Sequence, residues 1–379
     1  MIRQTIKTLA NMKFILSIVS ILILISCSSD SSDEGNCIFN GNITLSTQQE
    51  VNRFSSRYCE INGDLIVGSA SSISDITNLT KLQNLTSVSG SIIIINNPLI
   101  TNLNGLESLT TIGNFLTIRS NDNLTDTSSL SNVESNGINI AVINNNSLIN
   151  FQGLENLTAV GDIQILDNDL LDNFLAIKNV TSINSLEIIN NNSLTRLIGL
   201  ENILSTERYL IIKNNNMLNS LQSLSNLTII GGDLGIGNND ALTTLSGLEN
   251  LESVSGVEIF NNQNLTFITG IQNLRTMRRL SLSDNPSLAI LPTFNNLSIG
   301  AGSDGGLSIF NNDSLLSLDG LEGVIAFNGN VGIYENDNLS NFCALDSILN
   351  VGTINVFDIH NNLIDPDEND IISGNNCSI

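Results

Sequence analysis

The chain repeats one pattern of apolar and asparagine residues about every 23 or 24 positions, and this repeat limits the folds open to it. The copies that begin at Gly137 and Gly232 read GINIAVINNNSLINFQGLENLTAVG and GDLGIGNNDALTTLSGLENLESVSG. We call the apolar residue after each asparagine run the anchor of its copy. The anchors are Ile73, Ile100, Leu124, Leu148, Leu171, Leu194, Leu218, Leu242, Leu265, Leu288, Leu315, Leu339 and, loosely, Leu363. Because one copy could not bury its apolar side chains alone, we expect about 13 coils stacked around a continuous core.

Each coil is predicted to contain a short strand that ends just before the asparagines. Apolar residues lie eight and six positions before the anchor, for example Leu234 and Ile236. This alternation has the period of a strand with one face turned inward. Gly, Asn, Ser and Thr interrupt every apolar run before a helix could form. The pattern therefore predicts an all-β solenoid with three short extended segments per coil, separated by tight bends.

A polar residue, usually asparagine, precedes the anchor by four positions. This row contains Asn96, Asn144, Asp167, Asn190, Asn214, Asn238, Asn261, Asp284 and Asn311. One interpretation is a ladder of polar groups that binds a ligand. We favour a structural role, because an asparagine at a bend can hydrogen-bond the turn backbone and the same residue one coil on. Asparagine also tolerates the left-handed backbone that a tight corner requires.

A second row, five positions before the anchor, is predicted to point away from the core. It contains Ile95, Arg119, Ile143, Leu166, Ile189, Lys213, Gly237, Phe260, Ser283, Phe310 and Tyr334. A contiguous exposed apolar stripe is typical of an interaction surface. Covering loops, or the preference of strands for isoleucine, would explain the row equally well. Our candidates for ligand binding are Arg119, Lys213, Phe260, Phe310 and Tyr334.

The N-terminus has the features of an export signal. Residues 1–26 carry three basic residues and then an apolar run that is too short to span a membrane. The run ends in Leu-Ile-Ser-Cys at Cys27, which resembles the lipobox of bacterial lipoproteins, where the matching cysteine carries the lipid. Met12 is an equally good start and would leave Lys13 as the only charge of the signal.

The segment after the signal is predicted to be a tether. Residues 27–36 are rich in Ser and Asp and contain no apolar side chain that could pack into a core. This stretch also resembles the surface-export signals of Bacteroidetes lipoproteins. We therefore expect a protein held in the outer membrane only by lipid at Cys27. It would face the cell exterior or, alternatively, the periplasm.

Four further cysteines lie in pairs near the two ends of the chain: Cys37, Cys59, Cys343 and Cys377. An even number in an exported chain indicates disulfides. Three pairings are possible, and we expect Cys37–Cys59 with Cys343–Cys377, because these close two local loops. A zinc site is the alternative, but no Cys-x-x-Cys spacing occurs and His360 is the only histidine.

The ends of a solenoid need caps, since its core would otherwise be open to water. We expect an N-terminal cap at 37–62, the repeat solenoid at 63–342, and the last coil with a C-terminal cap at 343–379. The first cap contains a helix start at Ser46 or Thr47, followed by apolar residues at helical spacing. Asp-Pro-Asp-Glu at 365–368 indicates a second helix start. Its oxygen-bearing side chains also suit calcium, but the segment lacks the glycine that an EF-hand has at its sixth position.

The charge of the chain argues against nucleic acid as a partner. There are 14 Lys and Arg against 37 Asp and Glu, and removal of the signal would leave 11 against 37. Such a surface repels phosphate backbones. Arg275, Arg278 and Arg279 form the one basic cluster. It either receives an acidic ligand or, as we favour, balances nearby carboxylates.

Enzyme signatures are absent from the sequence. A single histidine excludes most histidine-based relays, and no Gly-x-Ser-x-Gly, phosphate loop or His-Glu-x-x-His occurs. There is no tryptophan and there are three tyrosines, where a glycosidase cleft would normally offer aromatic platforms. We expect no enzyme activity and no cofactor. A polysaccharide-active β-helix enzyme is the least favoured alternative.

The order of strand, asparagine turn and LTTLSGLENLESVSG resembles the leucine-rich-repeat variant of receptor L domains. These are ligand-binding β-helices of insulin- and epidermal-growth-factor-type receptors, with relatives among bacterial surface lipoproteins. The resemblance extends over about 37–379. It implies a right-handed solenoid whose open sheet face contacts a protein or a glycan, but it carries no universal binding residue.

We therefore expect a lipid-anchored recognition or adhesion module that binds an extracellular protein or glycan through its open sheet face. The main alternative is a structural spacer of the envelope or surface layer without a specific soluble ligand.

Overall fold

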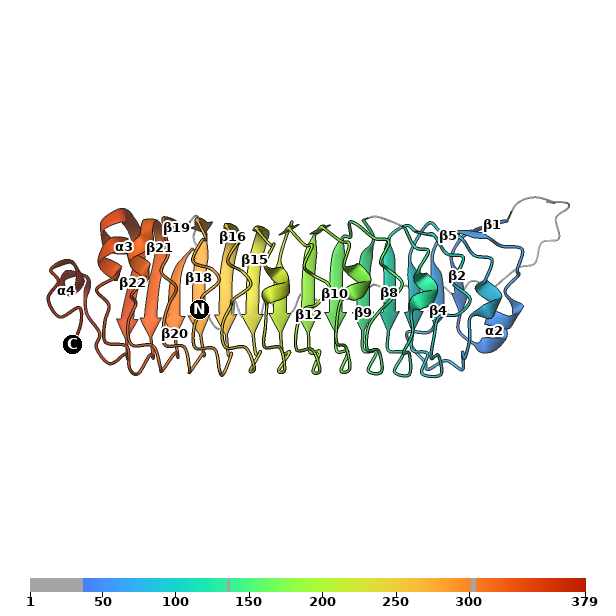
Figure 1. Cartoon of the computed structure of the whole chain (residues 1–379), viewed down its shortest axis with the longest axis horizontal. Coiled ribbons are helices and arrows are strands. Elements are labelled where there is room, and N and C mark those ends of the chain that lie inside the picture. The colour runs from blue at the N-terminus through green and yellow to red at the C-terminus, as the bar shows by residue number, and fades with distance from the viewer. Residues whose placement is uncertain (1–36, 135–136, 301–304) are drawn as a thin grey trace. The chain divides into compact units, whose positions relative to one another are not determined.

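The computed structural model describes residues 37–134, 137–300 and 305–379. The predicted signal and tether, with Cys27, lie outside these residues. Residues Cys37–Ile379 form one compact unit. Its coils stack into a parallel β-solenoid of about 13 turns with few helices and a disulfide at each end (Figure 1). The predicted fold class and cysteine pairing are confirmed.

One strand from each coil joins the main sheet of the solenoid. Each strand pairs in parallel with the corresponding strand of the next coil. In chain order the strands are β2 (Ile43–Leu45), β4 (Leu65–Gly68), β6 (Ile92–Ile95), β8 (Phe115–Arg119), β9 (Asn139–Ile143), β10 (Asp162–Leu166), β12 (Ser185–Ile189), β14 (Leu210–Lys213), β15 (Ile229–Gly237), β16 (Ser253–Phe260), β18 (Arg279–Ser283), β20 (Gly306–Phe310), β21 (Val324–Tyr334) and β22 (Gly352–His360). Stacked parallel strands place the same position of every coil in one row along the sheet.

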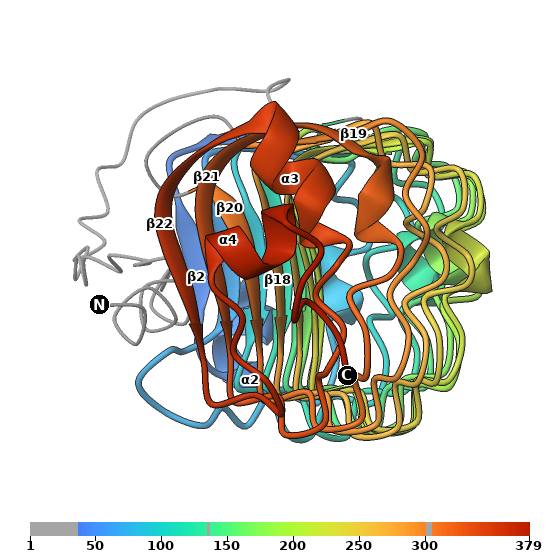
Figure 2. The same cartoon turned by 90° about the vertical axis from the view of Figure 1, so that its left-hand side faces the viewer.

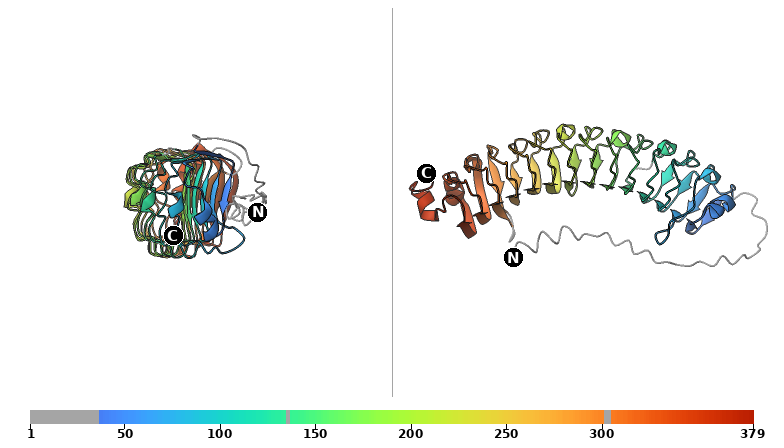
Figure 3. Two further views of the ribbon diagram at one scale, coloured as in Figure 1. Left: turned by 90° about the vertical axis from the view of Figure 1, so that its right-hand side faces the viewer. Right: turned by 90° about the horizontal axis from the view of Figure 1, so that it is seen from below.

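The other two sides of each coil are less regular than the sequence pattern predicts. One side carries short strands: β1 (Ile38–Asn40), β3 (Glu60–Asn62), β5 (Ser87–Val88), β7 (Thr111–Ile112), β11 (Ser182–Ile183), β13 (Ser205–Thr206), β17 (Thr276–Met277) and β19 (Leu297–Ile299). The remaining side has isolated bridges and the 3₁₀ turns η2 (Thr80–Leu82), η3 (Ser128–Leu130), η4 (Leu175–Ile177), η5 (Gln222–Leu224) and η6 (Leu321–Gly323). In Figure 3 the main sheet lies on the concave side of the bent stack and these turns on the convex side.

The anchors form the centre of the core. From Ile100 to Leu339 every predicted anchor is at most 1% exposed. The two end anchors are wrong, since Ile73 is 77% and Leu363 is 52% exposed. In the last coil a register shift in the pairing of β21 with β22 places His360 opposite Tyr334. Five positions on, Asp365 therefore occupies the anchor position of that coil.

The asparagine row confirms one part of its prediction and corrects another. The residues four positions before the anchor have positive φ, between 52° and 59° for the nine predicted members, so they adopt the left-handed conformation. The fully buried ladder, however, is formed by the next residue of each coil. Its members, all 0% exposed, are Asn97, Asn121, Asn145, Asn168, Asn191, Asn215, Asn239, Asn262, Asn285, Asn312 and Asn336.

Asn215 shows how the ladder links successive coils. Its Nδ2 donates to the carbonyls of Ile188, one coil back, and Lys213, at 2.9 and 3.0 Å. Its backbone N–H donates to Oδ1 of Asn239 at 3.0 Å, and its own Oδ1 accepts from the N–H of Asn191 at 3.0 Å. Buried backbone groups at the corner are thereby paired. The left-handed residues make only a partial surface ladder, as where Nδ2 of Asn214 donates to Oδ1 of Asn190 at 2.7 Å.

Short helices cap the two ends, and two of the three were predicted (Figure 2). Helix α2 (Gln48–Arg53) begins at Thr47, which forms a capping box with Glu50. Helix α4 (Glu368–Ile372) begins at Asp367, which forms one with Asp370. Helix α3 (Leu345–Val351) was missed; its Leu345 and Ile348 are buried against the last coils. Asp367 and Asp370, two of the side chains that suited calcium, thus act as caps of helix α4.

We expect the substitution Asn215→Ala to lower the free energy of unfolding by roughly 2–4 kcal/mol, because several buried backbone groups lose their partners. Asn216→Ala, at the exposed neighbouring position, is the matched control and should change stability by less than about 0.5 kcal/mol. Urea denaturation followed by circular dichroism measures both. Equal stability of the two variants would show that the ladder is not needed to hold the corners.

Candidate functional site

The outward row predicted from the sequence is one continuous line on the concave sheet. The strand registers place Lys213 beside Gly237, Gly237 beside Phe260, Phe260 beside Ser283, Ser283 beside Phe310, and Phe310 beside Tyr334. These pairings continue to Arg119 through the intervening coils. All five candidates therefore lie on the same face, but they do not form a single cluster.

Three glycines shape the middle of this face. A Cβ on Gly237 would lie 2.3 Å from Cζ of Phe260, so the tip of that ring occupies the space over the glycine. A Cβ on Gly235 would lie 3.5 Å from Cε of Lys213. One on Gly256 would meet the side chains of Asp233 and Arg279 at 2.7 and 3.0 Å. The missing side chains thus let Lys213, Phe260 and Arg279 lie down across the strands. We call these three residues the central cluster.

Lys213 and Phe260 contact each other in this cluster. Nζ of Lys213 lies 5.0 Å from the centroid of the Phe260 ring, within the range of a cation–π interaction. Burial lowers the pKa of Lys213 from its ordinary value, while the charges of Glu258 and Glu187 act in the opposite direction. Lys213 is therefore a half-buried cation that contacts an aromatic ring and is attracted by the charges of two carboxylates.

Arg279 of the central cluster and two arginines near it in the sequence are paired with acidic residues. Arg279 donates to Asp233 at 3.1 Å and to Glu258 at 2.7 Å, with 17% of its side chain exposed. Arg278 lies 3.7 Å from Asp233, and Arg275 lies 3.8 Å from Glu252. The prediction that the basic cluster balances nearby carboxylates agrees with this geometry.

A second charged group lies on the same face and extends from the coil of Lys213 toward the N-terminus. Arg208 reaches across two coils to Asp162 at 2.5 Å, and hydrogen bonding to Asp162 raises the pKa of the guanidinium. Burial raises the pKa of the neighbouring Tyr209. Sequence reasoning did not select these residues, because they lie nine or more positions before the anchor. The recurrence of charged residues nine positions before the anchor, at Asp162, Asp233 and Arg279, was the available signal.

An aromatic stack occupies the C-terminal end of the row. The rings of Phe310 and Tyr334 are parallel within 8°, with centroids 5.0 Å apart, and the His360 ring lies on Tyr334 at the same spacing and 11°. Burial raises the pKa of Tyr334. We call these three residues the terminal stack. His360 was not a predicted member, because it precedes the loose anchor Leu363 by three positions and not by five.

The five predicted residues therefore fall into three places. Lys213 and Phe260 belong to the central cluster, and Phe310 and Tyr334 to the terminal stack. Within the outward row, Ser283 lies between Phe260 and Phe310 and is one coil from each of them. Arg119 stands apart as an exposed side chain between the strand neighbours Ile95 and Ile143.

Other surfaces offer less chemistry. A shallow depression of about 400 Å³ on the turn edge is lined only by asparagine and aspartate. Across 37–134, 137–300 and 305–379, no group of three or more His, Cys, Asp or Glu side chains is arranged to hold a metal ion. Within the same ranges no helix is long and apolar enough to cross a membrane.

Residues 206–298 match the family model of the receptor L domain. The matched segment is less than half of the chain. It is also shorter than the range of about 37–379 over which the sequence pattern resembles this family. The matched segment contains the whole central cluster and none of the terminal stack. Receptor L domains are ligand-binding domains without enzyme activity, and their known ligands are proteins. A search of curated proteins found no match to the chain.

Two neighbouring substitutions test whether Gly237 provides the space that the Phe260 ring occupies. Gly237→Ala should push the Phe260 ring off the sheet, because the new methyl group would overlap it. Gly235→Ala is the matched control, since its methyl group would make only an ordinary contact with Lys213. Both glycines have negative φ, so backbone strain does not distinguish them. The ring chemical shifts of Phe260 should move in the first variant alone; unchanged shifts in both would contradict the proposed packing.

The two raised tyrosine pKa values predict a loss of stability in alkali. The unfolded chain ionises its tyrosines near pH 10.0, before the folded protein ionises Tyr209 and Tyr334. The stabilisation is complete below pH 10 and is lost as pH rises through the folded-state pKa values. Unfolding free energy measured from pH 9 to 11 should fall less in Tyr334→Phe than in the unaltered protein. An identical pH profile for both proteins would refute this assignment.

Proposed function

We propose that the protein is an exported recognition module that binds an extracellular protein through the concave face of its solenoid. The observation that carries this proposal is the central cluster, in which an aromatic ring, a half-buried lysine and a paired arginine lie flat on a floor of glycines. Aromatic and arginine side chains contribute most to binding energy at protein interfaces. The match of 206–298 to a ligand-binding family supports the same segment.

The solenoid suits such a role because the side chains of the central cluster are already held in place before a partner binds. The cluster residues project from strands that the neighbouring coils hold on both sides. Side chains that are already fixed by packing lose less conformational entropy when a partner arrives. The ion pairs of Arg279 with Asp233 and Glu258 also limit the number of orientations that the guanidinium can adopt.

The proposed location is the outer surface of the cell. Its basis is the lipobox-like sequence at Cys27 and the acidic tether at 27–36. Disulfides are maintained in oxidising compartments, so the bonds at both ends of the unit are compatible with export. In this arrangement a lipid at Cys27 would be the membrane attachment, and the tether would let the solenoid turn its concave face toward a partner.

The experiment is a binding screen of the full chain against arrays of extracellular proteins and of glycans. Phe260→Ala and Lys213→Ala should each weaken binding of the selected protein at least about tenfold, which corresponds to 1.4 kcal/mol. Phe267→Ala is the matched control, because Phe267 is 40% exposed but lies outside the main sheet. Surface plasmon resonance gives the dissociation constants.

Other outcomes would redirect the proposal. Equal loss of affinity in Phe267→Ala would move the binding face away from the central cluster. Selection of glycans but not proteins would change the ligand class while leaving the site in place. A folded, oxidised sample that binds nothing would favour a structural spacer of the envelope. Release of sugar products from a glycan would indicate an enzyme.

A further inference from the structure

At the C-terminal end of the solenoid, helices cover the core, but the edge of the main sheet is not covered by another strand among the described residues. Helices α3 and α4 cover the end of the core, where Ile348 and Ile371 are at most 2% exposed. The main sheet ends in β22, which pairs with β21 (Figure 2). Among the described residues no strand pairs with the other edge of β22. Of the nine residues of β22, the five after the register shift, 356–360, continue the main sheet, whereas β2 at the opposite end of the sheet has three.

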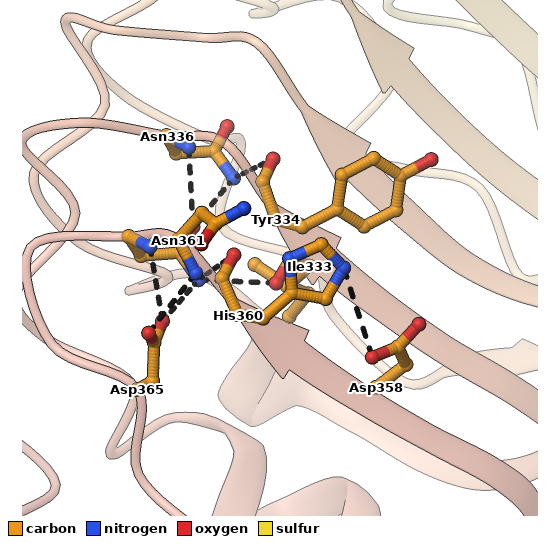
Figure 4. A network of polar contacts seen from close by, with 8 residues as sticks. Ile333, Tyr334, Asn336, Asp358, His360, Asn361 and Asp365 are labelled. Atoms are coloured by element: carbon orange, nitrogen blue, oxygen red, sulfur yellow. Dashed lines mark hydrogen bonds and ion pairs between the residues drawn. The ribbon is translucent and has the colours of Figure 1, made fainter.

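The asparagine ladder, in contrast, has a definite stop (Figure 4). Asn336 donates to Oδ1 of Asn362, as each ladder residue does to the next. The backbone N–H and Nδ2 of Asn362 then donate to Oδ1 of Asp365 at 2.9 and 3.0 Å. Asp365 thus replaces the asparagine of a further coil. The hydrogen bonds of the ladder thus end at Asp365, at the corner of the last coil. The strand of that coil, β22, still has one edge with which no described strand pairs.

The backbone of β22 has hydrogen-bonding groups directed at the open edge. The N–H of Glu335 donates to the carbonyl of His360, so His360 directs its amide groups at β21. Successive residues of a strand direct these groups to opposite sides. Phe357 and Ile359 therefore direct theirs away from β21. A row of free donors and acceptors of this kind is a template for pairing with another extended segment.

The side chains around this edge are only partly covered. Phe357 and Ile359 are in register with Val331 and Ile333, which are 0% exposed, yet both remain partly exposed because no further coil covers them. Val356 is 53% exposed on the outer face of the strand. The edge thus offers apolar contacts on both faces beside its backbone groups.

The charges around the edge are all of one sign. Residues 343–379 contain six carboxylates and no lysine or arginine. These are Asp346, Asp358, Asp365, Asp367, Glu368 and Asp370. A second copy that approached with the same end would bring its own carboxylates against them, and like charges in contact oppose association. A segment with lysine or arginine would be attracted instead.

We propose that the open edge of β22 binds an extended, basic segment of a partner protein as an added strand of the main sheet. Backbone hydrogen bonds to Phe357 and Ile359 hold the segment. Alternate apolar side chains of the segment cover these two residues, and its basic side chains face the surrounding carboxylates. This site lies apart from the central cluster and does not depend on it.

The probe is the fluorescently labelled octapeptide (Lys-Val)₄, added to the full chain and followed by anisotropy at low and physiological salt. A peptide with the same charge in which proline replaces every valine tests the backbone bonds, because proline cannot donate them. (Glu-Val)₄ tests the charge. We expect (Lys-Val)₄ to bind at least ten times more tightly than either. Equal binding of the proline peptide would reduce the interaction to charge alone and overturn the proposal.

Two further measurements locate the bound peptide. Amide hydrogen exchange should slow within 352–360 on addition of (Lys-Val)₄, and protection elsewhere without protection there would refute the site. Asp358→Asn combined with Glu368→Gln should weaken binding several-fold at low salt. Glu134→Gln combined with Glu207→Gln removes two exposed carboxylates far from β22 and should leave binding unchanged. Phe260→Ala should also have no effect, which keeps this site distinguishable from the concave face.

Sedimentation of the full chain alone tests the competing occupant. We expect a monomer at all concentrations, since the acidic ends repel each other. A concentration-dependent dimer that (Lys-Val)₄ dissociates would assign the edge to a second copy and overturn the proposed partner.

Discussion

The column of buried asparagines solves the problem that a narrow parallel solenoid meets at every corner. A chain that turns sharply leaves backbone groups inside the molecule, and buried groups without partners are costly. Here each asparagine pairs the corner of its own coil with those of the coils on either side, as Asn215 does with Ile188 and Asn239. The column therefore fixes the height at which each coil sits on the last. The register of the main sheet, and with it the alignment of the outward row, depends on this column.

The central cluster departs from the repeat while leaving the column intact. At Gly235, Gly237 and Gly256 the strands carry no side chain on the concave face, although other coils place isoleucine, glutamate or arginine at the same positions. Glycine weakens a strand, so its use at three neighbouring positions needs a compensating role. The compensation in the structure is space, which Phe260, Lys213 and Arg279 fill. The proposed binding face is thus shaped by missing side chains as much as by those that are present.

Periodicity allowed the coils, the inward strand face and the outward row to be predicted, because each follows from spacing along the chain. Features that depend on three-dimensional neighbours were not accessible in this way. The ladder was placed one residue early, since both positions are asparagine in most coils and only the backbone conformation shows which of them turns inward. Leu363 was taken as an anchor because the register shift between β21 and β22, which lengthens the last coil, leaves no mark in the composition. The meaning of Gly237 depends on a ring that comes from the next coil, and α3 is too short to show a helical period.

The positions of the two disulfides have a consequence for how long the protein lasts. In a stack whose coils contact only their neighbours, loss of structure starts at an end and proceeds coil by coil, like a zipper. Cys37–Cys59 ties the first coil to the second, and Cys343–Cys377 ties the last full coil to the segment that follows α4. Both bonds thus lie where unzipping would begin. For a protein exported as proposed, resistance to proteases would therefore depend first on the two ends of the stack. Surface side chains of the middle coils could then change without shortening the lifetime of the protein.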